Sequence, residues 1–526
     1  MKNIYQPVRF FLNYQKSKRY PYRVQKKILR YILNEQKNTA YGKAHSFSSI
    51  SSVKEFQKKV PITNYEDIKP YIQKIKQGEQ NILTKKKVIF FATSSGTTSA
   101  SKYIPVTSDR MKIFTNEFQL WSTRVLKKEQ IKVLGGKTLY FATASNLGTT
   151  KANIQFGNIT GYMVQKLPAM LKRKLVLPAH VYNIKNVKQR TEKIALVSLQ
   201  EDVRQLGFFA PIETILFLEY IYKNKKKLIA KIKKTNPKRA KELEELPEFK
   251  AKYFWPKLSL ISCVKTPSTI FYLDQLFELI GKKIPTRDPG IYASEGRISL
   301  GIVNNSRNGI IVANTSFFEF CECTKNATFK DPVCIHKIKK GKKYKVLITT
   351  TEGLYRHDIG DIVEVRGFKK KLPIIRYADR DNYINVAGEN MSEINLVTCV
   401  KEELQKQNIK SKHFTVCPCI SSPKNKPCYE ALLELDMTIS DKKLSRFAKE
   451  LEKNLQEKVL TYKKARNEFG RLEALQASIV KTQSYAKHTT KKQQKQKGQI
   501  KPILVSKDPT FREQFDIIKS VTATKK

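Results

Sequence analysis

The sequence predicts an α/β fold in which a large N-terminal domain with mixed β-sheets is followed by a small α+β C-terminal domain. At 526 residues, with 40% hydrophobic and 10% aromatic residues, the chain is long enough for a large core and for two or more domains. Short apolar, β-rich runs alternate with segments of helical periodicity over most of its length. After Pro373 the pattern changes to a helix, a hairpin, a second helix and a strand, which indicates a second and smaller domain.

The charge of the chain is extreme, with a formal net charge of +54 at pH 7. A net positive charge this large is typical of proteins that bind nucleic acid or anionic membranes. The charge is mostly lysine spread through every segment, however, and is not gathered into arginine-rich stripes interleaved with aromatic residues. We therefore expect no specific nucleic-acid partner, although the positive field would concentrate small anionic ligands near the protein.

The cysteines and the N-terminus indicate where the protein works. Eight cysteines show neither a C-x-x-C pair nor histidine partners at zinc-site spacing, so we expect reduced, buried thiols. The N-terminal MKNIYQ lacks the apolar core of a secretory signal, and no apolar run approaches the length that crosses a bilayer. These absences favour a cytoplasmic protein without a transmembrane segment.

The first hundred residues are predicted to contain two helices and then a loop between two strands. Helical spacing of apolar residues covers Arg23 to Gln36, and a shorter helix runs from Ser52 to Lys59. The apolar run from Val88 to Ala92 then gives way to small and hydroxyl residues. An extended pattern resumes at Lys102 to Thr107, so this region is a strand, a tight loop and a strand.

The loop between these two strands has the composition of a phosphate-binding loop. It contains Ser94, Ser95, Gly96, Thr97 and Thr98. Small side chains let backbone N–H groups approach a ligand, hydroxyl groups can donate hydrogen bonds to phosphate oxygens, and Lys102 adds a mobile positive charge. No Gly-Lys-Ser/Thr leads into a helix, so this is not a Walker A loop, and a Ser/Thr-rich turn is the alternative.

The middle of the chain alternates between helical, extended and loop patterns. We expect helices over residues 111–124, 185–206 and 212–222, buried strands over 137–145 and 255–263, and a loop over 157–161. Residues 223–250 carry lysine-rich and then glutamate-rich blocks around two prolines. This density of charge favours a solvated surface excursion over a partner site.

Two later motifs combine aromatic, carboxylate and glycine residues. The first contains Tyr292, Ser294, Glu295 and Gly296, and the second ends on Gly360 and Asp361 after a predicted strand at 344–350. A flat ring suits a nucleotide base, a carboxylate suits a hard divalent cation, and a carboxylate that accepts from two hydroxyl groups suits a ribose. Each motif alone is weak evidence for a nucleotide site, because a glutamate in a loop usually only faces solvent.

Several segments resemble, in the same order, the auxin-responsive acyl-acid amido synthetases, a branch of the adenylate-forming superfamily. They are NTAYGKAHSF, FQKKVPITNYEDIKPYI, GEQNILT, SSGTT followed by Lys102, a WP-x-L segment, YASEG and the Gly-Asp at 360–361. The resemblance covers nearly the whole chain and implies an adenylate-forming N-terminal domain that binds ATP and Mg²⁺. It implies that Tyr292 stacks on adenine, Glu295 approaches Mg²⁺ and Asp361 holds the ribose, and it adds the Tyr355–Arg356 pair nearby. The plant enzymes have an aromatic residue and an arginine where His357 and Asp358 stand, so their substrate contacts are not carried over.

The same resemblance places a hinge at Arg380 and Asp381, and so divides the chain into domains 1–378 and 379–526. It also implies that Arg380 belongs to the nucleotide-binding residues. The second domain is expected to be mobile. In it, Tyr462 and Arg466 fit the family's Y-x-x-x-R, and GQIKP at 498–502 fits its late G-Q-x-K-P. The superfamily's adenylation lysine lies in this late segment, which implies Lys501. In so lysine-rich a tail, a charged loop without chemistry is the alternative.

The implied activity is that of an ATP-dependent ligase that activates a carboxylic acid as an acyl-adenylate. The acyl group then passes to an amine, with an amino acid as the expected acceptor, and Lys102, Lys501 and Glu295 are the expected catalytic groups. Two alternatives remain open: a thioester ligase that uses coenzyme A or a carrier thiol, and a non-catalytic polybasic scaffold for nucleic acid or membrane. The sequence identifies neither the acid nor the amine, and we expect a monomer.

Overall fold

The structure, a computed structural model, describes most of the chain in two compact units. The described residues are 5–94, 102–125, 131–142, 144–184, 186–208, 210–265, 272–324, 329–380, 384, 386–387, 389, 391–419, 426–489 and 503–523. For residues 94, 123–125, 131, 379 and 380 the description is of the backbone alone. Unit 1 contains Met1–Lys265 and Leu273–Ala378, and unit 2 contains Tyr272, Asp379–Gln496 and the described residues of Ile500–Lys526.

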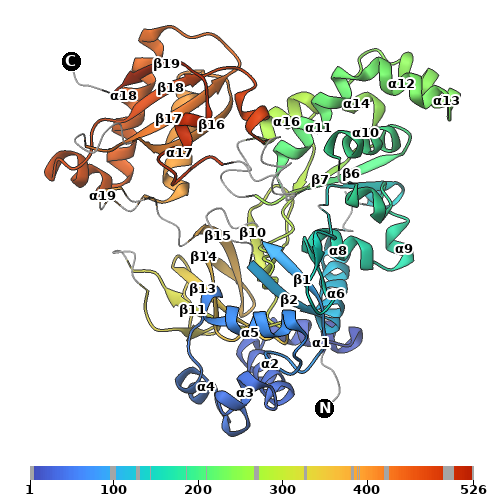
Figure 1. Ribbon diagram of the computed structural model, residues 1–526, viewed down its shortest axis with the longest axis vertical. Coiled ribbons are helices and arrows are strands. Elements are labelled where there is room, and N and C mark those ends of the chain that lie inside the picture. The colour runs from blue at the N-terminus through green and yellow to red at the C-terminus, as the bar shows by residue number, and fades with distance from the viewer. Residues whose placement is uncertain are drawn as a thin grey trace. The chain divides into compact units, whose positions relative to one another are not determined.

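Unit 1 begins with a layer of helices (Figure 1). They are α1 (Pro7–Ser17), α2 (Pro21–Gln36), α3 (Ala40–Ala44), η1 (Phe47–Ser49), α4 (Val53–Lys59) and α5 (Tyr65–Gln77). Proline at the first helical position starts α2, and Asn64 and Asp67 form a capping box at the start of α5. The buried face of α2 packs into the same core as the first strands of the chain.

A small sheet follows, with the strand order β2-β1-β5-β4. Its strands are β1 (Val88–Ser94), β2 (Lys102–Thr107), β4 (Gly148–Thr149) and β5 (Gln155–Gly157). The strand β1 is antiparallel to β2 and parallel to β5, so the predicted strand–loop–strand is an antiparallel hairpin. The next helices are α6 (Ser108–Val125), α7 (Ile131–Leu134), α8 (Ile159–Lys166), α9 (Ala169–Lys172) and η2 (Ala179–Asn183).

A second sheet of unit 1 is wholly parallel, with the order β3-β6-β7-β8. Its strands are β3 (Lys137–Tyr140), β6 (Val203–Gly207), β7 (Leu260–Ser262) and β8 (Thr286–Arg287). Its accompanying helices are α10 (Val187–Ser198), α11 (Pro211–Lys223), α12 (Lys225–Lys233), α13 (Pro237–Glu244), α14 (Ala251–Phe254) and α16 (Leu273–Ile280). Helices α12 and α13 pack on each other at the edge of this unit, within the charged segment 223–250 (Figure 1).

Several sequence-based assignments in this region are wrong, and the strands expected at 137–145 and 255–263 are shorter, at Lys137–Tyr140 and Leu260–Ser262. Residues 185–206 do not form one helix, because α10 ends at Ser198 and Val203–Gly207 is the strand β6. Val203 and Leu206 are fully buried there, so pairing between two parallel neighbours outweighs the local helical pattern. The expected loop at 157–161 is also shorter than predicted, since α8 already starts at Ile159.

The third sheet of unit 1 has seven strands in the order β12-β11-β13-β14-β15-β10-β9. They are β9 (Ser299–Gly301), β10 (Asn308–Ile311), β11 (Phe317–Glu322), β12 (Val333–Cys334), β13 (Lys343–Thr349), β14 (His357–Lys369) and β15 (Leu372–Arg380). The sequence predicted the strand before the third motif, which is β13. Fully buried side chains such as Phe318, Ile348 and Val363 make a second core along this sheet.

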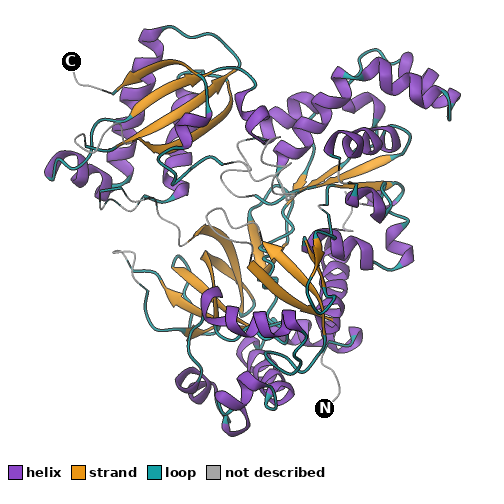
Figure 2. Cartoon of the chain, viewed as in Figure 1, coloured by secondary structure: helices purple, strands orange, loops and turns teal. Residues whose placement is uncertain are grey.

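Unit 2 is a four-stranded sheet with helices packed against it (Figure 2). Its elements are α17 (Glu393–Lys406), β16 (Ser411–Cys419), β17 (Cys428–Leu435), α18 (Asp441–Lys458), α19 (Leu460–Lys463), the π-helical turn η3 (Lys464–Glu468), β18 (Gln476–Val480), η4 (Phe511–Gln514) and β19 (Ile517–Thr522). The predicted hairpin, helix and strand are all present here. In the part of the chain that the structure describes, no helix is long and apolar enough to cross a membrane.

Candidate active site

The hairpin of β1 and β2 fixes the two ends of the predicted phosphate loop. Ser94 and Lys102 are direct partners in its register, so the loop leaves and re-enters the sheet at one place. The loop residues Ser95, Gly96, Thr97 and Thr98 lie outside the described residues, and Ser94 is described by its backbone alone. The ammonium nitrogen of Lys102 lies 5.6 Å from the centre of the Tyr65 ring, at the first turn of α5.

The segment before α5 connects this hairpin to the third motif. Thr63 accepts a hydrogen bond from the backbone N–H of Asp358 at 2.8 Å, and its hydroxyl oxygen lies 3.4 Å from Nδ1 of His357. The pKa of His357 is lowered to about 4, mainly by burial; the positive charge of Lys102 acts in the same direction, while the carboxylates of Glu295 and Asp67 oppose the shift. Lys102, Glu295 and His357 therefore share one electrostatic environment, although they come from three separate motifs.

The neutral state of His357 makes the stability of unit 1 depend on pH. The unfolded chain takes up this proton below about pH 6.5 and the folded chain only below about pH 4, so the free energy of unfolding falls by about 1.4 kcal/mol per pH unit as the pH is lowered between these values. We expect His357→Gln to remove that slope. Denaturant unfolding at several pH values checks this, and an unchanged slope contradicts it.

Two features sharpen that measurement. Both tryptophans of the chain, Trp121 and Trp255, lie in unit 1, so fluorescence follows this unit rather than unit 2. His413, whose pKa burial lowers to about 3, lies in unit 2 and provides the matched control: His413→Gln should leave the fluorescence-detected slope as it is.

The second motif forms a tight turn after β8. Ala293 and Gly296 exchange two backbone hydrogen bonds, and Tyr292 bridges Arg297 across the turn. A Cβ on Gly296 would lie 2.6 Å from Cδ1 of Ile348, so glycine lets the turn rest against β13. The turn leaves Tyr292, Ser294 and Glu295 partly exposed, as residues that contact a ligand must be.

Tyr292 lies between two arginines that the sequence analysis did not single out. Its hydroxyl accepts a hydrogen bond from Nη2 of Arg110 at 3.3 Å and donates one to the sulfur of Met163 at 3.3 Å. The guanidinium carbon of Arg297 lies 4.5 Å from the centre of the Tyr292 ring, within the range of a cation–π contact. These contacts hold the hydroxyl edge and one part of the ring in place.

A buried carboxylate supports this arrangement from helix α6. Nε of Arg297 donates to Oε2 of Glu117 at 3.3 Å, and Nη1 donates to the carbonyl of Pro289 at 2.7 Å. Glu117 is fully buried, burial raises its pKa against the opposing charges of Arg110 and Arg297, and its Oε1 has no hydrogen-bond partner among the described residues. The one sequence signal for this cluster was a glutamate on the apolar face of α6, between Phe114 and Phe118.

The third motif bends within β14. Lys345 pairs with Ile362 and Leu347 pairs with Asp358, so the register shifts around Gly360, whose φ of +74° favours glycine. Asp358, which differs from the plant pattern, has a structural role here. Its carboxylate accepts hydrogen bonds from the N–H of Gly360 at 2.8 Å and from the ammonium group of Lys345 at 3.1 Å. The bulge sets the direction of Asp361, which is 7% exposed.

Tyr355 and Arg356 belong to the core rather than to an open site. Tyr355 is 1% exposed, stacks on Tyr41 with ring centres 4.7 Å apart, and donates to the carbonyl of Leu83 at 2.5 Å. Burial raises its pKa well above the usual range. This environment argues against the nucleotide contact expected for Tyr355, and we leave it out of the proposed site.

The Y-x-x-x-R pattern of unit 2 has a structural explanation. Tyr462 donates to Oε2 of Glu452 at 2.7 Å, and Arg466 donates to Oε1 of the same carboxylate at 3.0 Å. The pair therefore satisfies a buried carboxylate on α18. Lys501 and the G-Q-x-K-P segment lie outside the described residues, and Arg380 is described by its backbone alone.

The fold has the architecture of the adenylate-forming ligases. The structure of 2-hydroxyisobutyryl-CoA ligase in complex with its acyl-AMP superposes with a TM-score of 0.51 and 11% identity, covering 98% of this chain and 92% of that one. The structure of the Arabidopsis GH3.15 acyl acid amido synthetase in complex with 2,4-DB superposes far better, with a TM-score of 0.86 at 19% identity and coverage of 100% and 99%. At such identities these likenesses show the fold alone.

The chain belongs to the GH3 family. Models of the family's N-terminal, central and C-terminal domains match residues 12–285, 309–380 and 394–510. It is 24% identical to indole-3-acetic acid-amido synthetase GH3.3 of Arabidopsis thaliana, with 72% of this chain and 70% of that protein covered. It is 23% identical to jasmonoyl-L-amino acid synthetase JAR4 of Nicotiana attenuata, with 69% and 70% covered. The family and fold predicted from the sequence are confirmed.

Proposed function

We propose that this protein is an ATP-dependent acyl-acid amido synthetase. A substrate carboxylate attacks the α-phosphorus of ATP and pyrophosphate leaves, which gives an acyl-adenylate. The nitrogen of an amine, most simply an amino acid, then attacks the acyl carbon, and AMP leaves as the amide forms. The observation that carries the proposal is the match of all three GH3 domain models to a chain whose β1–β2 hairpin holds Lys102 at one end of the predicted phosphate loop.

The chain's own residues take distinct parts in this reaction. Lys102 and Lys501 neutralise charge that develops on the phosphate oxygens, and Tyr292 offers the adenine a ring face. Glu295 would hold Mg²⁺, which neutralises phosphate charge when it is bound. A single glutamate suits this role, because Mg²⁺ binds through one or two carboxylates together with the nucleotide's phosphates.

The proposal includes a movement of the C-terminal domain about Arg380 and Asp381 between the two half-reactions. That movement would withdraw Lys501 after adenylation and open a path for the amine. We also propose a monomer in the cytoplasm that does not depend on a nucleic-acid partner. Exchange of pyrophosphate into ATP, measured over a panel of carboxylic acids, tests the first half-reaction: acid-dependent exchange is expected, and binding of ATP without exchange for any acid counts against it.

Substitution of Asp361 should raise KM for ATP and leave the order of preference among acids unchanged. Losing a carboxylate that accepts from two ribose hydroxyls is expected to raise KM for ATP in Asp361→Ala by about tenfold or more. The control is Asp331→Ala, an exposed aspartate of the same unit that lies outside this motif. An altered order of preference among acids in Asp361→Ala would contradict the ribose role.

Arg297 should contribute to ATP binding because it holds the ring of Tyr292 in place. Arg297→Lys keeps a positive charge beside Glu117 but loses the planar guanidinium over the ring and the bond to Pro289, so KM for ATP is expected to rise about tenfold while KM for the acid stays the same. Exposed Arg366→Lys is the control in the same unit. Equal rises in both KM values would mean that Arg297 only supports the fold.

A further inference from the structure

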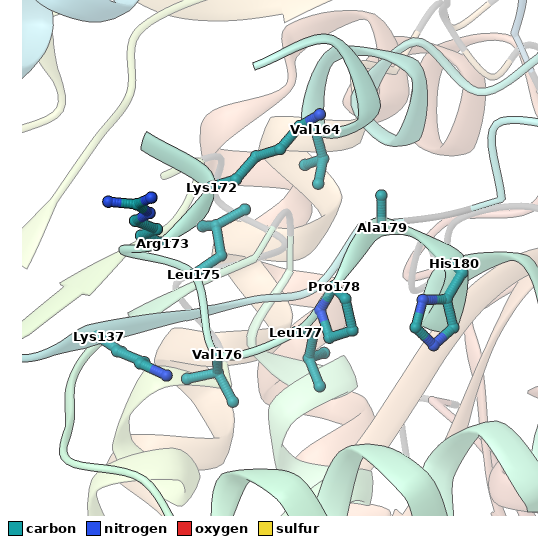
Figure 3. Close-up of a pocket in the computed structure, with 10 residues that line it drawn as sticks. All are labelled: Lys137, Val164, Lys172, Arg173, Leu175, Val176, Leu177, Pro178, Ala179 and His180. Atoms are coloured by element: carbon teal, nitrogen blue, oxygen red, sulfur yellow. The ribbon is translucent and has the colours of Figure 1, made fainter. Parts of the chain in front are cut away.

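A pocket of about 700 Å³ lies in unit 1 beside β3, which is the edge strand of the parallel sheet. Its lining residues are Lys137, Val164, Lys172, Arg173, Leu175, Val176, Leu177, Pro178, Ala179 and His180 (Figure 3). The segment after α9 runs along the outer side of β3, where the N–H of Val176 donates to the carbonyl of Thr138 at 3.0 Å. The volume falls within the range of small-molecule sites.

The charge of this lining is of one sign. Its charged residues are Lys137, Lys172 and Arg173, and the lining includes no acidic residue. Lys137 is paired with Glu201 at 2.7 Å. The side chains of Lys172 and Arg173 make neither a hydrogen bond nor an ion pair within the described part of the chain, so two cations face solvent uncompensated at the pocket.

The rest of the lining is apolar and firmly held. Val164, Val176 and Leu177 are buried, and Leu175 packs against the core of the first sheet. Figure 3 shows Leu175, Val176 and Leu177 between Lys137 and Arg173 on one side and His180 on the other. Leu175, Pro178 and Ala179 keep accessible surface above these buried side chains, so an occupant can lay an apolar body along them while an anionic group meets the cations at one end.

The pocket and the candidate active site lie at different ends of the same sheet. Lys137 begins β3, whereas Tyr292 and Glu295 follow β8, and the strands between them are parallel. Helix α8 separates the two, since Met163 contacts Tyr292 and its neighbour Val164 lines the pocket. The cations and the apolar residues of this pocket are thus different from the residues of the candidate active site.

We propose that this pocket binds an amphipathic organic anion, namely a carboxylate on an apolar chain or ring, as a second ligand of the enzyme. Its carboxylate lies at Lys172 and Arg173, and its apolar part lies along Leu175 to Pro178. A bare inorganic anion would not use the wall, and a neutral apolar molecule would not use the cations. This assignment does not depend on the proposed reaction.

Calorimetric titration of the full chain with octanoate tests the assignment. We expect octanoate to bind, and acetate and 1-octanol to bind at least about tenfold more weakly, because each lacks one of the two features. The double variant K172E/R173E should lose about tenfold or more in octanoate affinity. Ala179→Trp, which fills the pocket without changing charge, should lose it as well.

The matched control is K233E/K234E, which changes net charge by the same amount at two exposed positions, the last residue of α12 and its C-cap. It should bind octanoate as the wild type does. Absent octanoate binding, unchanged binding in both pocket variants, or an equal loss in the control would overturn the site. A rise in KM for the activated acid in K172E/R173E, parallel to the loss of octanoate binding, would overturn its separation from the reaction site.

Discussion

Lys501→Ala is expected to form acyl-adenylate about 10²-fold or more slowly than the wild type, a typical loss for one charge-stabilising group in a transition state. The reason is local, because the attack on the α-phosphorus concentrates negative charge on oxygens that a lysine would neutralise. In the second half-reaction the amine attacks the acyl carbon, and the proposed domain movement has by then withdrawn Lys501 from the phosphate. A supplied acyl-adenylate should therefore react with the amine at nearly the wild-type rate.

Single-turnover assays of the two half-reactions make this comparison, with Lys481→Ala as a control in the same unit. A selective loss of adenylation supports both the role of Lys501 and the withdrawal of this lysine between steps. Equal losses in both half-reactions would make Lys501 structural and would contradict the hinge movement about Arg380 and Asp381.

Arg356→Met is expected to cost unit 1 about 3–5 kcal/mol of its free energy of unfolding. Arg356 is 5% exposed, and its Nε donates to Oε2 of the fully buried Glu319 at 3.0 Å. Its Nη1 donates at 2.7 Å to the carbonyls of Gln57 and Val60, at the end of α4. The substitution leaves a buried carboxylate uncompensated and two carbonyls without a donor, so it loosens the helical layer from the seven-stranded sheet.

Urea unfolding followed by the fluorescence of the two tryptophans measures this loss in unit 1. The double variant Arg356→Met/Glu319→Gln removes the uncompensated charge of the Glu319 carboxylate and should recover part of the stability. A loss below about 1 kcal/mol in Arg356→Met, the range of an exposed ion pair, would contradict the role of this residue as a clamp.

What the sequence predicted well depends on local chemistry. The hairpin around the phosphate loop follows from an apolar run that changes abruptly to small and hydroxyl residues at Thr93 and resumes at Lys102. The strand before the third motif likewise follows from the apolar, β-rich run at 344–350, where β13 lies. Such signals need no knowledge of which segments pack together.

What the sequence did not predict depends on tertiary packing. Val203 and Leu206 read as the end of a helix, and only their place between β3 and β7 makes them a strand. Tyr355 was assigned a ligand from its motif, while its environment of Tyr41 and Leu83 is set by segments some three hundred residues away. The pairing of Glu117 with Arg297 joins a helix to a turn much later in the chain, so no local sequence pattern predicts it.

The central claim is amide formation through an acyl-adenylate, and one assay tests it most directly. Pyrophosphate release from the purified protein with ATP and Mg²⁺ is measured over a panel of carboxylic acids, with and without a mixed pool of amino acids, and products are identified by mass spectrometry. We expect acid-dependent release that rises with amino acids and yields the amide. Release that rises with coenzyme A and not with amino acids would contradict the amide step. No release, together with no binding of ATP, would contradict the account as a whole.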